Sequence, residues 1–176
     1  MADLSRCAFV ALGANLPSAA GTPLTTLQRA VDALRAHSAA PPVVSPYYES
    51  DPKDCPPLSP RYCNAVVALW PRADETALSL LLKLQRIEAD FGRVRSSLVN
   101  AARTLDLDLL TFPNASSNTT QLTLPHPRAH ERRFVLEPWI AIAGAAWPLH
   151  QRTLGQWLEA CGDPPLLRVI ETDGAE

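Results

Sequence analysis

The stretch RTLDLDLL, from Arg103 to Leu110, decides how this chain is interpreted. Its alternation of leucine with polar residues is typical of a strand whose leucines share one face. Asp106 and Asp108 then share the opposite face, about 6–7 Å apart by the rise of a strand. Aspartate is uncommon in strands, and two carboxylates on one face repel each other. The pair therefore predicts either a solvated face stabilised by arginines or a site for a divalent cation.

The loop before this strand is basic. It carries Arg93, Arg95 and Arg103 within eleven residues. Any one of them would be ordinary in a solvated turn, but guanidinium groups are well suited to phosphate oxygens. Arginines beside two carboxylates favour phosphoryl chemistry on a nucleotide, with one or two Mg²⁺ ions held by the aspartates. The chain contains neither GxxxxGK[ST] nor GxGxxG, which excludes the P-loop and dinucleotide-binding fingerprints.

Residues 76–91 predict an amphipathic helix that Asp74 caps and Gly92 ends. Its apolar arc contains Leu78, Leu81, Leu84 and Ile87. Gln85 and Glu88 fall within this arc, three residues apart and therefore neighbours. They either reach water near the helix end or face a polar site, where the arginines of the next loop would be partners for Glu88.

The order of the predicted elements gives the fold class. They are strand 7–12, helix 23–37, strands 43–50 and 62–70, helix 76–91 and strand 104–112, followed by helical patterns at 130–144 and 153–162. This βαββαβ order predicts an α+β, ferredoxin-like fold, an antiparallel sheet with helices on one face and C-terminal helical additions. Pro46 indicates an edge or a bulge in the second strand. The length predicts a single domain over residues 1–176.

Composition excludes several classes of protein. Apolar residues make up 47% of the chain and charged residues 19%, which predicts a packed core. A net charge of −2 argues against general binding to nucleic acid or to a membrane surface. No apolar run reaches the ~18–20 residues that span a bilayer, and the N-terminus lacks the basic region of a secretory signal. The four cysteines show no zinc spacing, so we expect reduced thiols in a cytoplasmic protein.

Further polar and aromatic residues are candidates for ligand binding. Tyr62, Asn64 and Phe134 can line an aromatic-walled pocket with one amide, although each alone is typical of ordinary packing. His126, in LTLPHP, can be a phosphate donor, a base or a turn residue.

Together these stretches resemble the 6-hydroxymethyl-7,8-dihydropterin pyrophosphokinase family. The matching segments cover nearly the whole chain: FVALGANL, YYESDP, YCNAVVAL, LLKLQRIEADFGRVR, ARTLDLDLL and LTLPHPRAHERRFVLEP. The resemblance implies the ferredoxin-like fold and transfer of diphosphate from ATP to the pterin hydroxymethyl group in folate biosynthesis, with AMP as the other product. We expect a monomer that binds ATP and the pterin, with no nucleic-acid or membrane partner.

The resemblance also implies roles for individual residues. The catalytic residues would be Arg93, Arg103, Asp106 and Asp108, and the two aspartates would ligate two Mg²⁺ ions when ATP is bound. The ATP-binding residues would be Gln85, Glu88, Arg95, His126 and Arg132. The pterin-binding residues would be Ser50, Pro52, Lys53, Tyr62, Asn64 and Phe134.

The chain departs from the family pattern in its loops. Ala102 stands where proline is usual, Asn100 where an aromatic is common, and the loop from Lys53 to Arg61 has no glycine. These changes bear on loop closure, so one alternative is a slow or non-catalytic pterin- or nucleotide-binding homologue. The other is a ferredoxin-like RNA-binding module, against which the acidic balance and the lack of a basic aromatic strand argue.

Overall fold

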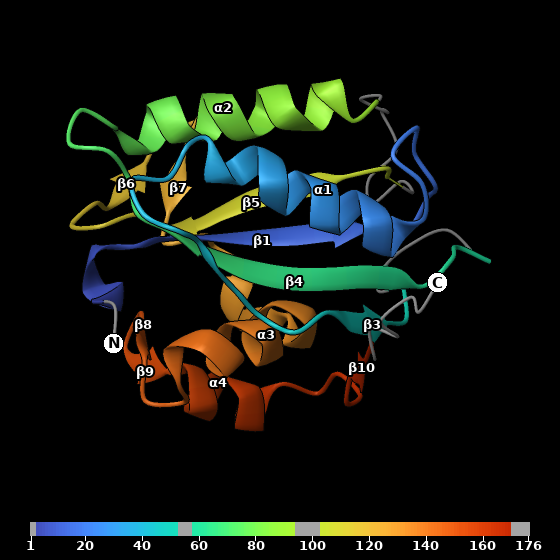
Figure 1. Cartoon of the computed structure of the whole chain (residues 1–176). Helices are drawn as coiled ribbons and strands as arrows, with labels where there is room; N and C mark the ends of the chain where they lie inside the picture. The colour runs from blue at the N-terminus through green and yellow to red at the C-terminus, as the bar shows by residue number, and fades with distance from the viewer. Residues whose placement is uncertain (1–2, 53–57, 94–102, 170–176) are drawn as a thin grey trace.

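The computed structural model describes residues 3–52, 58–93 and 103–169, in which helices cover both faces of an antiparallel sheet (Figure 1). The sheet contains β1 (Ala8–Ala14), β2 (Val43–Val44), β3 (Tyr48–Ser50), β4 (Tyr62–Leu69), β5 (Asp106–Thr111) and β10 (Leu167–Arg168). The strand order is β10-β3-β4-β1-β5, and β2 pairs with β4 outside this path. The mixed α and β architecture with an antiparallel sheet, predicted from the sequence, is confirmed.

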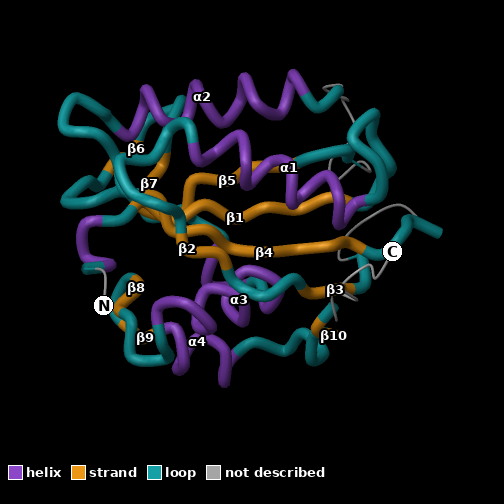
Figure 2. The backbone as a smooth tube through the Cα atoms, in the orientation of Figure 1, coloured by secondary structure: helices purple, strands orange, loops and turns teal. Residues whose placement is uncertain are grey.

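Two helices lie on each side of the sheet. On one face lie α1 (Pro23–Arg35) and α2 (Ala77–Asp90), and on the other lie α3 (Arg133–Ala143) and α4 (Leu154–Ala160) (Figure 2). The smaller elements are the 3₁₀ turns η1 (Leu4–Arg6) and η2 (Ala129–Glu131) and two hairpins, β6 (Ser117–Asn118) with β7 (Thr123–Leu124) and β8 (Pro148–Leu149) with β9 (Arg152–Thr153). Within the described ranges, no helix has the length and apolar character needed to cross a bilayer.

The sheet separates two hydrophobic cores. Alternate residues of β1 point to opposite faces, so Val10 and Leu12 pack under α1 and α2 while Phe9 packs against α3. Trp139 of α3 is fully buried, with its ring centroid 5.2 Å from that of Phe9. Because both faces of β1 and β4 are covered, these two strands form a nearly continuous buried layer.

The division of RTLDLDLL between the two faces is confirmed. Leu105, Leu107 and Leu109 belong to the core under α1 and α2. Asp106 and Asp108 alternate with them, on the face that α3 covers. Burial of the leucines thus fixes β5 in the sheet, and the two carboxylates point to the opposite face.

The predicted strand 43–50 is wrong as one continuous element. The structure breaks it into β2 and β3 around Ser45 and Pro46. Ser45 N donates to Val66 O at 2.9 Å, while Ser45 Oγ accepts from Val66 N at 2.9 Å and donates to Pro46 O at 2.8 Å. The side chain of Ser45 thus takes the place of a main-chain acceptor directly before Pro46, which has no N–H to continue the ladder. The edge strand β10 was not predicted.

The prediction for α2 needs two corrections. Thr76 is the N-cap, not Asp74, because the Thr76 side chain accepts from Ser79 N and Ser79 Oγ accepts from Thr76 N in a reciprocal capping box. Leu78 is 40% exposed, and the buried stripe instead consists of Leu80, Leu84, Ile87 and Glu88. Glu88 is therefore buried among leucines rather than reaching for water.

The contact between Phe9 and Trp139 yields a stability prediction. Trp139→Ala is expected to lower the free energy of unfolding by about 3–5 kcal/mol, because it removes a fully buried aromatic ring. Trp139→Phe is the matched control and should cost only about 1 kcal/mol, because it keeps an aromatic contact and loses an indole nitrogen that has no hydrogen-bond partner among the described residues. Urea unfolding measures both changes, and equal losses would contradict this account of the core.

Candidate active site

A cavity of about 530 Å³ opens on the α3 face of the sheet. Residues from β1, β3, β4, β5, η2 and α3 surround it. They are Ala11, Leu12, Gly13, Ser50, Asp51, Tyr62, Asn64, Arg103, Asp106, Asp108, His126, Pro127, Arg128, Glu131, Arg132, Phe134 and Val135. Carboxylates and arginines thus share one hollow with aromatic side chains and an amide, which suits a ligand with both charged and ring-shaped parts.

Small residues in β1 make the floor of this cavity. Gly13 pairs with Asp106 on one side and with Asn64 on the other, and Ala11 pairs with Asp108 and Val66. Across the sheet, the carboxylate of Asp106 on β5 is followed by Gly13 on β1, which has no side chain, and then by the amide of Asn64 on β4. Because neighbouring strands lie about 4.8 Å apart, the missing side chain leaves a gap of two strand spacings between the functional groups of β4 and β5.

The turn after α2 brings Arg93 to the carboxylates. Gly92 has φ +79°, and the hydrogen bonds from Gly92 N to Ala89 O and from Arg93 N to Glu88 O, both 3.0 Å, form a Schellman turn. Glycine meets this left-handed conformation without strain. The turn reverses the chain, so the Arg93 side chain forms an ion pair with Glu88, five residues earlier.

Asp106 is the centre of an ion-pair network. Arg103 Nη1 lies 2.6 Å from its Oδ2, and Arg93 Nη1 lies 2.8 Å from its Oδ1. Glu88, which shares Arg93, also accepts a hydrogen bond from Leu107 N at 2.7 Å. The network ties α2 and the segments on both sides of residues 94–102 to the first residues of β5.

Burial, reinforced by the neighbouring carboxylates, raises the pKa values of Asp108 and Glu88 toward neutrality. Burial, followed by the neighbouring charge of Asp106, raises the pKa of Asp108 to about 7. Burial also raises the pKa of Glu88 to about 7, with Asp106 and Asp108 adding to it against the opposing effects of Leu107 N and Arg93. In the absence of a cation, these carboxyl groups hold protons more tightly than exposed ones do.

His126 is arranged as a neutral donor at the cavity wall. Burial and then the charge of Arg128 lower its pKa. Its Nδ1 accepts a hydrogen bond from Arg128 N at 3.2 Å, which places the proton of the neutral ring on Nε2. This N–H can donate to an oxygen of a bound ligand, while the exposed Arg128 adds positive charge at the rim.

The other side of the cavity holds Asn64 in a fixed orientation. Its Nδ2 donates to Ser50 Oγ at 3.0 Å and approaches Tyr48 O and Tyr62 O, both at 3.4 Å. The amide oxygen lies toward Gly13, where a β-carbon would be 3.7 Å away. The Asn64 amide oxygen is therefore available as an acceptor in the cavity, while its amide nitrogen donates to the neighbouring strands.

Phe134 is the aromatic wall at the start of α3. The guanidinium of Arg132 lies over its ring, 5.5 Å from the centroid, within the range of a cation–π contact. One residue thus links the aromatic part of the cavity to its cationic part.

The structure brings most of the predicted site residues together. Nine of them line the cavity: Ser50, Tyr62, Asn64, Arg103, Asp106, Asp108, His126, Arg132 and Phe134. Arg93 and Glu88 join it through the network around Asp106. Gln85 and Pro52 are described but are not among the lining residues, and Lys53 and Arg95 lie outside the described residues.

Sequence reasoning missed several lining residues, of which Arg128, Glu131 and Asp51 are charged. The segment LTLPHPRAHERR gave a signal for two of them, because its density of charged residues around His126 is high for a turn. Gly13 and Ala11 gave none, because small residues in a buried strand are ordinary.

The donor set fits Mg²⁺ shared with a substrate. Asp106 and Asp108 offer hard carboxylate oxygens whose mutual repulsion a cation would relieve. Among the described residues, no group of three or more His, Cys, Asp or Glu could hold a metal alone. This agrees with the usual habit of Mg²⁺, which takes one or two protein carboxylates and completes its shell with phosphate oxygens and water.

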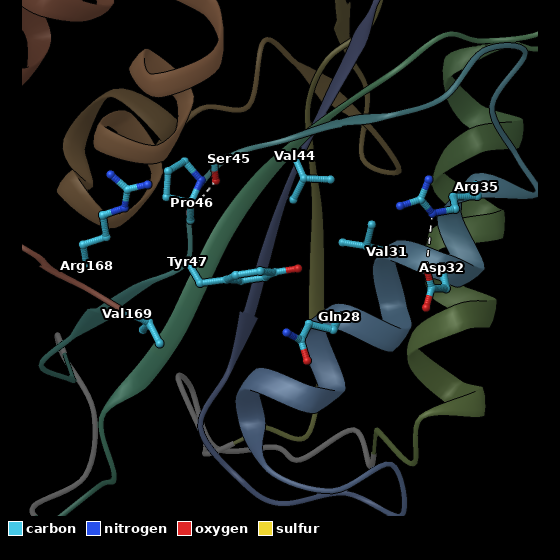
Figure 3. Close-up of a pocket in the computed structure, with 10 residues that line it drawn as sticks. All are labelled: Gln28, Val31, Asp32, Arg35, Val44, Ser45, Pro46, Tyr47, Arg168 and Val169. Carbon is cyan, nitrogen blue, oxygen red and sulfur yellow. Dashed lines mark hydrogen bonds and ion pairs between the residues drawn. The ribbon is translucent and has the colours of Figure 1, made fainter. Parts of the chain in front are cut away.

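A second groove, of about 800 Å³, lies on the opposite side of the sheet, between α1 and the segment that joins β2 to β3. Figure 3 shows the ring of Tyr47 extending across it toward α1. Its charged residues on α1 are paired with each other, Arg35 Nε lying 3.2 Å from Asp32 Oδ1. It lacks the gathered carboxylates and arginines of the first cavity, which we therefore take as the candidate active site.

Comparison with known proteins identifies the family of the chain. Residues 9–144 match the family model of 7,8-dihydro-6-hydroxymethylpterin-pyrophosphokinase. The chain belongs to this family. The resemblance drawn from the sequence motifs is therefore confirmed, and the matched range includes every residue of the candidate site named above.

Two relatives in this pyrophosphokinase family carry the name 2-amino-4-hydroxy-6-hydroxymethyldihydropteridine pyrophosphokinase. The protein of Haemophilus influenzae is 39% identical over 137 residues, covering 77% of this chain and 81% of the relative. That of Pseudomonas aeruginosa is 39% identical over 154 residues, covering 87% and 90%.

A solved structure shares the fold of the chain. It is a crystal structure of HPPK-DHPS in complex with substrates, with a TM-score of 0.64 and 11% sequence identity. The match covers 88% of this chain and 43% of the solved chain, so the chain spans less than half of that protein. At this identity the likeness concerns the fold alone.

The raised pKa values predict how stability depends on pH without Mg²⁺. In the folded state Asp108 and Glu88 have pKa values of about 7, above their values of 3.8 and 4.5 in the unfolded state. At pH values between the unfolded and folded pKa, the folded state therefore binds more protons than the unfolded state. The stabilising effect of the two groups is complete below about pH 4 and is lost as pH rises through 7. We expect the free energy of unfolding to fall between pH 5.5 and 8 by more than about 1.4 kcal/mol, the equivalent of one pKa unit.

Urea unfolding in EDTA across this range tests the expectation. Asp108→Asn should flatten the dependence, because it removes one titrating group and relieves repulsion on Glu88. Asp32→Asn is the control, since the Asp32 side chain on α1 is 72% exposed. A flat profile in the wild-type protein would contradict the crowding described here.

Proposed function

We propose that this chain transfers diphosphate from ATP to 6-hydroxymethyl-7,8-dihydropterin, giving AMP and the pterin diphosphate in folate biosynthesis. The observation that carries the proposal is the pair Asp106 and Asp108, which faces one cavity together with Arg103 and Asn64 in a member of the pyrophosphokinase family. Phosphoryl transfer of this kind asks for positioning and charge stabilisation more than for covalent chemistry by the protein.

The phosphate half of the site would lie over β5. Asp106 and Asp108 would hold Mg²⁺, with two ions expected when ATP is bound. Bound Mg²⁺ supplies Lewis-acid charge that neutralises phosphate oxygens and lowers the pKa of the attacking hydroxyl group. Arg103 and Arg93 would stabilise charge on the transferred group, and their ion pairs with Asp106 support this role because they keep both guanidiniums at the metal site.

Other residues would orient ATP. His126 Nε2 would donate to a phosphate oxygen, as its hydrogen bond through Nδ1 suggests. Arg132 would contribute positive charge, and Arg128 joins this group because it lines the cavity. The remaining ATP-binding residues of the proposal are Gln85, Glu88 and Arg95. Glu88 would act indirectly, because it is buried and contacts Arg93.

The pterin half would lie over β4 and the start of α3. The Asn64 amide oxygen would accept a hydrogen bond from an N–H on the edge of the pterin, and the orientation of its Nδ2 toward Ser50 supports this. Tyr62 and Phe134 would pack against the ring faces. Ser50, Pro52 and Lys53 would complete this half of the site.

We also infer the finer features of the molecule. The order β3-β4-β1-β5, with α1 and α2 on one face, supports a ferredoxin-like core to which α3 and α4 are additions. Residues 1–176 would form a single domain that acts as a monomer, without a nucleic-acid or membrane partner. The free thiols of Cys7, Cys63 and Cys161 support a reducing, cytoplasmic environment.

The first functional prediction concerns the metal-binding carboxylates. Asp108→Asn is expected to reduce Mg²⁺-dependent AMP formation by at least about 10²-fold, the range seen when one preorganised group for transition-state charge is lost. The assay follows AMP release from ATP with and without the pterin, in Mg²⁺ and in EDTA. Asp90→Asn, at the exposed end of α2, is the control and should retain activity. Unchanged AMP formation by Asp108→Asn would remove the basis of the proposal.

The second functional prediction separates catalysis from binding. Arg103→Ala should lower kcat by about 10³-fold, on the precedent of charge-stabilising arginines, and change the affinity for ATP much less. Steady-state kinetics together with a direct ATP-binding titration measure the two quantities. Equal losses in both would reassign Arg103 to ground-state binding of ATP.

A further inference from the structure

Asn15 is a buried polar residue next to the candidate active site. It follows the last residue of β1 and is only 2% exposed. Its Oδ1 accepts a hydrogen bond from Arg103 N at 2.8 Å, and its Nδ2 donates to Pro60 O at 3.3 Å. In addition, Asn15 N and Leu16 N both donate to Arg103 O at 3.1 Å.

These bonds hold the main chain of Arg103 on both of its polar sides. Its N–H is bound by the Asn15 side chain and its C=O by two consecutive N–H groups. Arg103 precedes β5, so the β-ladder does not fix it, and Asn15 and Leu16, directly after β1, hold it instead. The Arg103 side chain therefore starts from a fixed backbone when it reaches Asp106 Oδ2, 2.6 Å away.

The second bond of the Asn15 side chain leads to the other half of the cavity. Pro60 lies two residues before Tyr62, the first residue of β4 and a cavity-lining residue. One amide thus joins the segment that carries Arg103 to the segment that leads into the aromatic wall. Only a side chain with both an acceptor and a donor can make the two bonds, which accounts for asparagine at this position.

We propose that Asn15 is a positioning residue that fixes the Arg103 guanidinium at the reacting phosphate and sets its position relative to the pterin half of the site. This inference rests on the proposed function, because it assigns Asn15 an effect on turnover through Arg103. Asn15 is not a lining residue of the cavity, so its effect on the reaction is indirect.

A double-mutant cycle between Asn15 and Arg103 tests the proposal. Asn15→Ala should lower kcat by about 10²-fold, the scale of a displacement of about 1 Å in a catalytic group, with a much smaller change in the KM for ATP. In the Arg103→Ala background, the same substitution should lower kcat by less than about 3-fold, because the group that Asn15 positions is gone. Additive losses would overturn the proposal.

Asn15→Asp separates the two arms of the amide. It keeps the acceptor for Arg103 N but replaces the donor to Pro60 O with a second oxygen. We expect kcat to recover to within about 10-fold of the wild-type value, with the remaining defect in the KM for the pterin. Asn15→Leu, which has a similar shape but neither an acceptor nor a donor, serves for the cycle if Asn15→Ala does not fold. A kcat of Asn15→Asp as low as that of Asn15→Ala, in a folded protein, would contradict the assignment.

Ser45→Ala is the matched control for buried-polar loss. Ser45 is 3% exposed and, like Asn15, accepts a hydrogen bond from a main-chain N–H, that of Val66, but neither Ser45 nor Val66 is among the residues that line the cavity. It should lower the thermal unfolding temperature and leave kcat unchanged. If kcat falls with Ser45→Ala as it does with Asn15→Ala, Asn15 has only a general structural role. Absence of AMP formation by the wild-type protein would instead refute the proposed function, so the two failures are distinguishable.

Discussion

The crowding of carboxylates against guanidinium groups at the start of β5 is the interaction on which the site depends. Glu88, Asp106 and Asp108 face two partly buried arginines, Arg93 and Arg103. Burial disfavours every one of these charges, and the attraction between opposite signs compensates only where both partners are in place. Asp106 forms ion pairs with both arginines, whereas burial and then the charge of Asp106 raise the pKa of Asp108 against the weaker opposing effects of Arg103, Arg93 and Arg128. A cation would relieve the repulsion between the two aspartates, which supports the proposed magnesium site here.

Hydrogen bonds to the main chain, rather than side-chain packing, hold the two arginines in this network. The Schellman turn at Gly92 directs Arg93 back over the end of α2, and the bonds from Asn15 and Leu16 fix Arg103 at the beginning of β5. An arginine side chain has many rotamers, so a fixed backbone limits where its charge can go but does not fully determine it. The ion pairs with Asp106 complete the restriction from the other end.

Local patterns in the sequence predicted what depends on local physics. Alternation in RTLDLDLL gave the two faces of β5, and the misplaced charge of Glu88 on an apolar arc marked the polar site next to α2. Features that depend on partners distant in the sequence were harder to predict. The break at Ser45 depends on its bond to Val66, twenty-one residues away, and β10 exists only because β3 offers an edge. Neither leaves a periodic signal in the sequence.

The same distinction explains the errors within α2 and the site. Asp74 and Thr76 are both acceptable caps, and the reciprocal bond with Ser79 decides between them. Leu78 is exposed because the sheet, rather than the widest apolar arc, sets the rotation of the helix. The high density of charged residues in LTLPHPRAHERR marked this segment, but the sequence of a turn does not show which of its side chains lie near β5, so Arg128 was missed. Asn64 was named as a site residue through the family resemblance, and strand periodicity fixes only the face on which it lies.

Gly13 and Ala11 form the floor of the cavity, between the strands that carry the functional groups. This floor limits how resistance to an inhibitor could arise. A compound seated there would rest largely on main-chain atoms, which no amino-acid replacement removes. Resistance would require bulkier residues at these two positions, and the same bulk would exclude the natural substrates. An inhibitor designed against this floor would therefore leave few routes to resistance by point mutation.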